Sequence, residues 1–372
     1  MVELKVEAVD LPLHYGRTPR WLFERMVKLS KAMVEIIIYE YGQTEFIKRI
    51  SNPYFFQAFG CTIGFDWHSS GLTTTTCGAL KLALKPEEHG IKVAGGKGRT
   101  SKKTPQEIEE GAETFSLSTN SIEKLKYSSY MSAKVDNAVL QDGYDLYHHN
   151  FIFTEKNNWC VIQQGLSSQT NYARRYHLIS DEIRSFVDEP NSAICCDRTE
   201  NFILDLTAKE SEKTRETSLD LVKDGPEHLM RYIKPTRQML LTEFDNKDVN
   251  ILTLPNRHEI LDVDISKRGW ETLKKAYELQ PESYEELVAL RGVGAKTLRA
   301  LALISELLFG AEPSWKDPVK YSFAHGGKDG YPFPIEKQTY DTSIVILKEV
   351  VEKARIDDKE KYNAIRRIKD FV

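Results

Sequence analysis

The sequence lacks the features that mark disulfide-stabilised, zinc-binding and membrane-spanning proteins. Its five cysteines are scattered along 372 residues and none forms a Cys-x-x-Cys pair. This argues against a disulfide framework and against a thiolate zinc site. No apolar run is long enough to span a bilayer, and no charged-then-apolar leader opens the chain. We therefore expect a cytoplasmic protein with no membrane partner.

A strong net charge is also missing. The formal net charge is −4, so the molecule as a whole is not a basic nucleic-acid binder, and any such role must come from local basic patches. The hydrophobic fraction of 41% and the charged fraction of 28% are typical of a folded chain with a substantial core. A chain of 372 residues is long enough for two domains.

The first part of the chain mixes helical and strand patterns. Apolar residues at helical spacing predict a helix over residues 20–41. The aromatic, Thr-rich and Gly-punctuated stretch 53–84 predicts strands or tight loops before a short helix. Residues 146–166 predict a β-hairpin, because two apolar strands flank a polar turn at 155–158.

Helical patterns dominate elsewhere. Thr104, Pro105 and Glu107 predict a helix start, with Thr at the cap, Pro at the first helical position and Glu three residues after the cap. Helical patterns continue to about residue 145 and return after residue 199, and a Pro/Gly/aromatic loop precedes a last helix from about Thr342. We predict a mixed α/β (α+β) N-terminal domain over residues 1–200, then a mainly α-helical C-terminal domain over residues 201–372.

A glycine turn lies between two apolar helical segments in ELVALRGVGAKTLRALALISELLFG, residues 286–310. Ser283 and Glu286 fit a capping box on the first segment. Gly292 and Gly294 permit backbone angles closed to other residues, and Lys296 and Arg299 stand beside them. Backbone N–H groups at such a turn form an anion site.

The segment at about 284–308 resembles the helix-hairpin-helix motif of DNA repair and replication proteins. That motif grips the sugar-phosphate backbone without reading sequence. An ordinary helical corner with a glycine cap is the alternative. In glycosylases with lyase activity, a lysine at the place of Lys296 attacks the sugar, assisted by an aspartate, for which Asp317 is the candidate here.

Residue types suited to nuclease chemistry gather in the N-terminal half. Carboxylates hold Mg²⁺ or Mn²⁺, and a Lys or His positions water or stabilises charge. The candidate catalytic residues are Asp66, His68, Lys134, Asp136, Asp142, His148 and His149. The candidate metal ligands are Asp66, Asp136 and Asp142. Aspartates that cap helices or sit at the surface are the alternative, and no standard spacing joins the set.

Three further residues are candidates for holding phosphate, namely Lys97, Arg174 and Arg175. His148 and His149 are consecutive, so we expect that they cannot both face the core from one strand and that one of them is satisfied internally. A restriction-type nuclease motif would place Asp or Glu and then Lys on the second hairpin strand. That strand ends instead in Gln163-Gln164-Gly165, which argues against a restriction-type fold.

The chain resembles domain-of-unknown-function family 763, a family of archaeal and bacterial proteins. The resemblance is carried by segments spread over most of the chain, which are GFDWHSSG, AGGKG, SAKVDNAVLQDGYDLYHH, IQQGL, ARRYHL, LRGVGAKTLRALAL, DPVKYSFAHGGKDG and PFP. It implies a DNA-processing role, namely a repair nuclease with 3′-to-5′ exonuclease character. No catalytic residue is carried over from the family, so the candidate sites rest on residue chemistry.

The sequence thus predicts a metal-dependent DNA-repair nuclease, a 3′-to-5′ exonuclease on single-stranded DNA, with Mg²⁺ or Mn²⁺ as cofactor. A glycosylase–lyase using Lys296 and Asp317 is one alternative, and a non-catalytic DNA- or RNA-binding adaptor is the other. A backbone grip distinguishes DNA from RNA poorly. The oligomeric state stays open, with a homodimer among the options.

Overall fold

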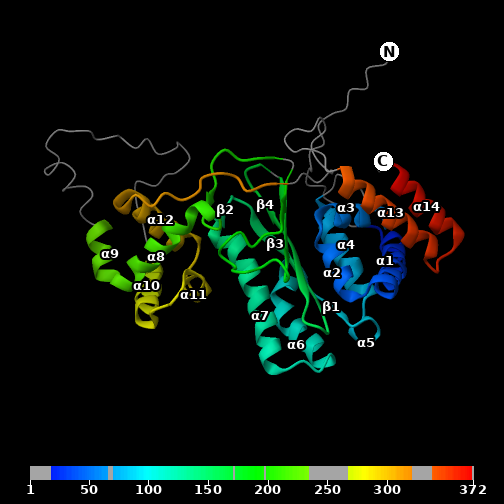
Figure 1. Ribbon diagram of the computed structural model, residues 1–372, viewed down its shortest axis with the longest axis horizontal. Coiled ribbons are helices and arrows are strands. Elements are labelled where there is room, and N and C mark those ends of the chain that lie inside the picture. Colours follow the sequence, from blue (N-terminus) through cyan, green and yellow to red (C-terminus); the bar gives the residue numbers. More distant parts are fainter. Residues whose placement is uncertain are drawn as a thin grey trace, which may run out of the picture.

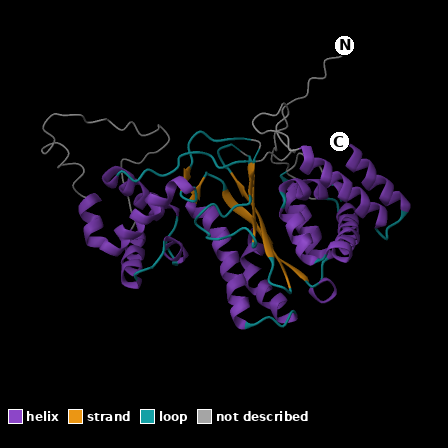
Figure 2. Ribbon diagram, viewed as in Figure 1, coloured by secondary structure: helices purple, strands orange, loops and turns teal. Residues whose placement is uncertain are grey.

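The computed structural model describes residues 18–65, 70–170, 172–196, 198–233, 267–320 and 337–370. A twisted sheet stands at the centre, with one group of helices on its right and others below and to its left in Figure 1. Figure 2 shows the strands confined to this central layer. Within the described part of the chain, no helix combines the length and apolar character needed to cross a bilayer.

All strand pairs of the central sheet are antiparallel, in the order β1-β3-β4-β5-β6. Their bounds are Ile91–Lys97 for β1, Asp145–Thr154 for β3, Trp159–Leu166 for β4, Ala173–Ile179 for β5 and Ala193–Cys195 for β6. Two short strands, β2 (Leu140–Gln141) and β7 (Leu204–Asp205), form a second sheet. The hairpin predicted over residues 146–166 is confirmed as β3 and β4, joined by a turn at residues 155–158.

One face of the sheet packs on helices from both ends of the chain. These helices are α1 (Arg20–Tyr41), α2 (Gln43–Ser51), α3 (Pro53–Thr62), α4 (Gly71–Ala83), α13 (Lys337–Lys353) and α14 (Asp358–Asp370). A short helix, α5 (Pro86–His89), leads into β1. Ile152 and Ile162 of the sheet share one apolar cluster with Leu347 and Ile368 of the last two helices. The domain boundary at residue 200 stays a prediction, and this core spans it. The helix predicted over 20–41 is confirmed as α1.

The other face of the sheet packs on a second set of helices. Phe151 and Val161 point to this side, where they share a cluster with Leu287 and Leu301. The elements on this side are η1 (Gly98–Lys103), α6 (Thr104–Thr114), α7 (Thr119–Lys134), the π-helical turn η2 (Val135–Val139), η3 (Lys209–Ser211), α8 (Glu212–Asp224), α9 (Pro226–Ile233), α10 (Lys267–Leu279), α11 (Tyr284–Ala289) and α12 (Ala295–Phe309). Helices therefore cover both faces of a small antiparallel sheet, and the fold is a mixed α+β one.

The short helix predicted at the end of residues 53–84 is confirmed as α4, but the strands or loops predicted before it are wrong where the structure has α3. Asn52 caps α3 by accepting from the N–H groups of Tyr54 and Phe55, and Pro53 opens the helix. All ten residues of α3 are buried, so no polar stripe alternates with an apolar one. A helix that is buried all round shows no periodicity of 3.6 residues.

The helix start at Thr104 is confirmed, but its predicted cap is wrong. Thr104 is the first residue of α6, and its hydroxyl donates to the Ser101 carbonyl at 2.6 Å. The Glu107 carboxylate accepts from the Gly95 N–H at 2.7 Å and from Lys81 Nζ at 2.6 Å. Glu107 therefore fixes β1 to α4 and α6, which sequence spacing alone does not reveal.

Two helical glycines give a matched test of the packing between α3 and α4. A Cβ on Gly60 would lie 2.8 Å from Leu72 side-chain atoms and from Thr76 Oγ1, whereas a Cβ on Gly78 would lie 3.7 Å from the Phe23 ring. Alanine is favoured over glycine inside a helix by about 1 kcal/mol. We expect Gly78→Ala to raise the free energy of unfolding by about that amount and Gly60→Ala to lower it, as measured by urea denaturation. Equal effects at the two positions would contradict this packing.

Candidate functional site

The candidate residues that the structure describes fall in two places. Two of the predicted catalytic residues, Asp66 and His68, lie outside the described residues. The other candidates gather at one end of strands β3–β5 with η2, or at the turn between α11 and α12. The two places are joined by Gln141, which directly follows the π-helical turn and Leu140. Its Nε2 donates to the Ala295 carbonyl at 2.9 Å.

His148 and His149 both lie in the core, so the expectation that only one of them faces it is wrong. Neighbouring residues of β3 point to opposite faces of the sheet. His148 is 1% exposed and His149 is 7% exposed, because helices cover both faces. The two histidines therefore lie in separate polar surroundings, one on each face of the sheet.

The network around His149 is a chain of buried hydrogen bonds from α7 to η2. The Gln163 Nε2 donates to the Ser132 carbonyl at 2.9 Å and to the Asp136 carboxylate, so its Oε1 is free to accept. His149 Nδ1 lies 2.7 Å from this Oε1 and therefore carries the proton. His149 Nε2 then accepts from the Ser129 hydroxyl, at 2.9 Å. Burial lowers the pKa of His149, which keeps the ring neutral.

Asp136 ends this chain inside the π-helical turn η2. Its Oδ2 accepts from Gln163, and its Oδ1 accepts from Asn191 Nδ2 at 2.9 Å. Burial raises the pKa of Asp136 to about 7, against the effect of these two hydrogen bonds and with help from the charges of Asp142 and Asp205. A carboxyl group that titrates near neutral pH is suited to proton transfer. Single π-helical turns also recur at functional sites.

The second network centres on Arg174, which is fully buried on β5. Its guanidinium donates to Asp142 Oδ2 at 3.1 Å and to both oxygens of Asp317, at 3.1 and 2.7 Å. Asp142 Oδ2 also accepts from the Tyr176 hydroxyl at 2.6 Å, and burial raises the pKa of Asp142 despite Arg174. The Arg174 carbon Cζ lies 4.4 Å from the ring centroid of Tyr144.

The opposite face of the sheet carries polar atoms without partners. His148 on β3 pairs with Gln164 on β4, and Asn150 lies two positions along β3. Among the described residues, both ring nitrogens of His148, Gln164 Oε1 and Asn150 Oδ1 have no hydrogen-bond partner. Burial lowers the pKa of His148 to about 3, so the ring is neutral. Native proteins keep few such atoms outside functional sites.

Hydrogen bonds fix the two amides on this face. Gln164 Nε2 donates to the Ser70 carbonyl at 3.0 Å and to the Tyr147 hydroxyl at 2.5 Å. Asn150 Nδ2 donates to the Ala94 carbonyl at 3.2 Å. Both carbonyl oxygens are therefore held with their acceptor sites open.

Two of the predicted phosphate-binding residues lie on this same face. Arg175 is 1% exposed, and it donates to Gln57 Oε1 at 3.0 Å and to His177 Nε2 at 2.8 Å. Its guanidinium, like that of Arg174, is therefore held inside the protein. Lys97 is exposed, and its Nζ lies 5.6 Å from the ring centroid of Tyr147. Lys97 is thus the one of the three strand residues predicted to hold phosphate that reaches solvent.

A cavity of about 150 Å³ reaches both networks of the His149 face. It is lined by Asn191, which holds Asp136, and by Asp317, which holds Arg174, together with Asp205. Among the described residues, no group of three or more His, Cys, Asp or Glu side chains is arranged to hold a metal ion. The oxygens of Asp136 and Asp142 accept from protein groups instead.

The glycine turn joins the short helix α11 to α12. Ser283 caps α11 by accepting from the Glu286 N–H at 3.2 Å, as predicted. The Glu286 carboxylate returns to the N–H of Glu282, at 2.8 Å, rather than to Ser283. Gly292 adopts φ +103°, and a Cβ there would lie 2.8 Å from Thr272 Oγ1 on α10. Glycine is therefore required at position 292 by both backbone and packing.

The N-terminus of α12 is open. Gly294 precedes α12 without a side-chain cap, and no described acceptor bonds the N–H groups of Ala295 and Lys296. Lys296 is exposed, whereas Arg299 is half-buried and donates from Nε to Gln141 Oε1 at 2.6 Å. Lys296 therefore lies beside the free N–H groups, and Arg299 anchors α12 to β2.

Asp317 is committed to structural hydrogen bonds. Besides the two from Arg174, its carboxylate accepts from the Glu200 N–H at 2.7 Å and the Val319 N–H at 3.0 Å. No hydrogen bond joins it to Lys296 within the part of the chain that the structure describes. The Lys296–Asp317 pairing of the lyase alternative stays a prediction without a contact to support it.

Sequence reasoning missed several members of these networks. Ser129, Asn191 and Tyr176 are single polar residues with no motif around them. Gln163 and Arg174 carried a usable signal, because each is polar in a strand whose other end is apolar. Polar residues at one end of otherwise buried strands indicate a site, since burial without partners is costly.

The raised pKa of Asp136 predicts a pH dependence of folding. In the unfolded chain an Asp titrates near about 3.9, so between that pH and about 7 only the folded state keeps the Asp136 proton. Stability from this proton is present below the unfolded pKa and is lost as pH rises through 7. We expect urea denaturation to give a smaller drop from pH 5.5 to pH 8 for Asp136→Asn than for the unaltered protein. Asp145→Asn, at an exposed position, is the control, and an equal drop in all three proteins would refute the shift.

Removing one carboxylate from Arg174 should destabilise the fold. Asp317→Ala leaves the buried guanidinium with Asp142 alone, which we expect to lower the free energy of unfolding by on the order of 3 kcal/mol. Lys316→Ala changes the exposed neighbour and should leave stability within experimental error. Chemical denaturation of both variants checks this, and equal stabilities would mean that the Asp317 bonds contribute little.

Comparisons with known proteins place the chain in one family. No curated protein and no solved structure matches it. One family model, described as a protein of unknown function (DUF763), matches residues 7–335, which is most of the chain. That range includes the sheet, both polar networks and the glycine turn. The chain therefore belongs to the DUF763 family.

Proposed function

We propose that the protein binds DNA by its sugar-phosphate backbone at the turn between α11 and α12, and processes it as a metal-dependent nuclease. One observation carries the proposal: a glycine turn presents an uncapped helix N-terminus with exposed cations beside it. Free N–H groups and the helix dipole favour a phosphate at this position. On this basis we infer that α11, the turn and α12 act as a helix-hairpin-helix.

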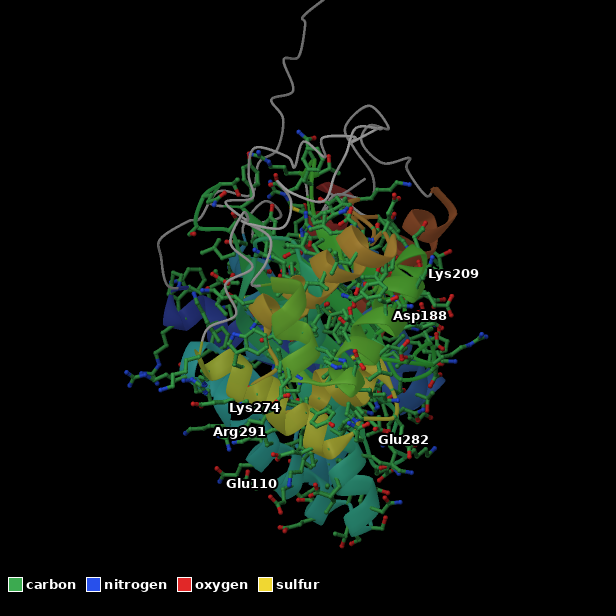
Figure 3. All side chains as sticks on the ribbon, turned by 90° about the vertical axis from the view of Figure 1, so that its left-hand side faces the viewer. Glu110, Asp188, Lys209, Lys274, Glu282 and Arg291 are labelled. Carbon is green, nitrogen blue, oxygen red and sulfur yellow. The ribbon has the colours of Figure 1, made fainter. Side chains whose placement is uncertain are left out.

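Exposed basic side chains extend the surface around the turn. Arg291 lies within the turn and Lys274 lies on α10, and Figure 3 shows the two on the same side of the molecule. Glu282, at the other end of α11, lies on the opposite side of the same view. Exposed cations beside the turn attract a phosphate backbone and make binding sensitive to salt.

The nuclease part of the proposal is supported by the carboxyl groups near the turn. Asp136 and Asp142 are buried with raised pKa values, and such groups cluster at functional sites. The π-helical turn that carries Asp136 packs against α12. A strand held at the glycine turn would therefore lie close to this acidic group. The carboxylates of the described residues do not assemble a metal site, so the metal ion enters as part of the proposal alone.

Of the two glycines in the turn, Gly294 can be replaced to test DNA binding without disturbing the fold. Gly294 has ordinary extended angles, and a Cβ there meets nothing within 4 Å, so Gly294→Ala should fold normally. The added methyl would stand next to the free N–H groups of α12. We expect anisotropy titrations with labelled single- and double-stranded DNA to show at least tenfold weaker binding. For Lys296→Ala, binding to duplex DNA should depend less on salt. The slope of log affinity against log salt should become smaller in size by about 0.9, the value for one lost phosphate contact on duplex DNA.

Controls and the activity assay complete this test. Lys359→Ala removes an exposed lysine from α14, far along the chain, and should bind as the unaltered protein does. End-labelled DNA incubated with Mn²⁺, Mg²⁺ or EDTA should shorten from its 3′ end only with metal, and Asp136→Asn should bind without shortening it. If Gly294→Ala leaves the affinity for DNA unchanged, the proposed backbone grip is refuted. Binding without any product would leave the adaptor alternative, and a borohydride-trapped adduct lost in Lys296→Ala would favour the lyase.

A further inference from the structure

A half-exposed tyrosine and an unpaired lysine border the glycine turn on α7. The Tyr130 hydroxyl donates to the Ala289 carbonyl, the last residue of α11, at 3.1 Å. Lys134 lies one helical turn further on, and its Nζ is 5.8 Å from the Tyr130 ring centroid. Arg291 of the turn lies near enough to Tyr130 to lower the pKa that burial raises. The ring thus has one cation, Lys134, over it and a second, Arg291, near enough to act on its hydroxyl.

Lys134 lies over the Tyr130 ring, and its charge has no polar partner within the described residues. Among the described residues, it has neither a hydrogen bond nor an ion pair, although partial burial lowers its pKa. It is the last residue of α7, where the π-helical turn begins. α11 packs on α7 and α12 packs on that π-helical turn, so Lys134 stands where both helices of the hairpin meet the sheet layer. An ammonium group without a hydrogen bond or an ion pair is suited to bind an anion.

The carboxylates of α11 make hydrogen bonds to neutral groups, and no ion pair of theirs with Lys134 or Arg291 is present among the described residues. The Glu285 carboxylate accepts from the Tyr127 hydroxyl at 2.9 Å and from the Ser185 hydroxyl at 3.0 Å. The Glu286 carboxylate accepts from the Glu282 N–H. Both carboxylates are therefore committed within α11 and its neighbours. The side of the turn that carries Tyr130, Lys134 and Arg291 stays basic and aromatic.

We propose that Tyr130 and Lys134 form a subsite for one unpaired nucleotide next to the glycine turn, with the base against the tyrosine ring and the phosphate on the lysine. This inference rests on the proposed backbone grip and names its substrate as single-stranded DNA or a single-stranded end. A base in a duplex is stacked on both sides and cannot reach a protein ring. The turn itself contacts phosphates of either form, so preference for single strands comes from the subsite.

The test compares single-stranded and duplex DNA across four variants. Tyr130→Ala should weaken binding of an oligothymidylate by about tenfold, within the range for one base–aromatic stack, and should leave duplex binding within twofold. Tyr130→Phe keeps the ring and loses only the bond to Ala289, so it should bind single strands normally. Lys134→Gln should reduce the salt dependence of single-strand binding. Tyr362→Ala, at an exposed tyrosine of α14, should change nothing.

The outcomes separate this inference from the grip on which it depends. If Gly294→Ala abolishes binding while Tyr130→Ala does not change the preference for single strands, the subsite is overturned and the grip stands. If Tyr130→Ala and Tyr130→Phe weaken both DNA forms equally, the tyrosine supports α11 rather than a base, and the subsite is again overturned. If the unaltered protein binds neither DNA form, both proposals fail. Thermal unfolding of each variant shows whether it is folded.

Discussion

One buried guanidinium holds together three distant parts of the chain. Arg174 comes from strand β5 of the five-stranded sheet, Asp142 follows the π-helical turn, and Asp317 follows α12. A buried charge is stable only when opposite charges and hydrogen bonds surround it, so the three segments must meet for any of them to be buried. Arg174 therefore ties the segment after α12 to the sheet, and with it the candidate grip to the neighbourhood of Asp136.

Polar and apolar residues divide each central strand between two tasks. Strand β3 has His148, His149 and Asn150 in its middle and Phe151, Ile152 and Phe153 towards its other end. The apolar residues belong to the two cores, one on each face of the sheet. The polar residues lie on the same two faces, where His149 joins a chain of hydrogen bonds and His148 and Asn150 carry the atoms without partners. Because both faces are covered by helices, polar groups on either face need partners within the protein or from a ligand. Two consecutive histidines can therefore both be buried and yet lie in unrelated polar surroundings.

Features fixed by local physics were predictable from the sequence. The helix at residues 20–41, the hairpin and the cap at Ser283 depend on nearby residues only. The helical nature of α3 was not predictable, because complete burial removes the pattern that sequence reasoning uses. Asp136 could be chosen from its residue type and setting. Its partner Asn191, 55 residues away, could not, since their contact exists only in the folded chain.

The position of α13 and α14 has a consequence for synthesis. These helices complete the core around α1, α3 and α4, although they are made after all the other described elements. During translation, the first helices must wait for almost the entire chain before their apolar faces are covered. Partly folded chains with exposed apolar surface are prone to aggregation. A ribosome stalled after the sheet would thus hold an incomplete core, which closes only when α13 and α14 have been made.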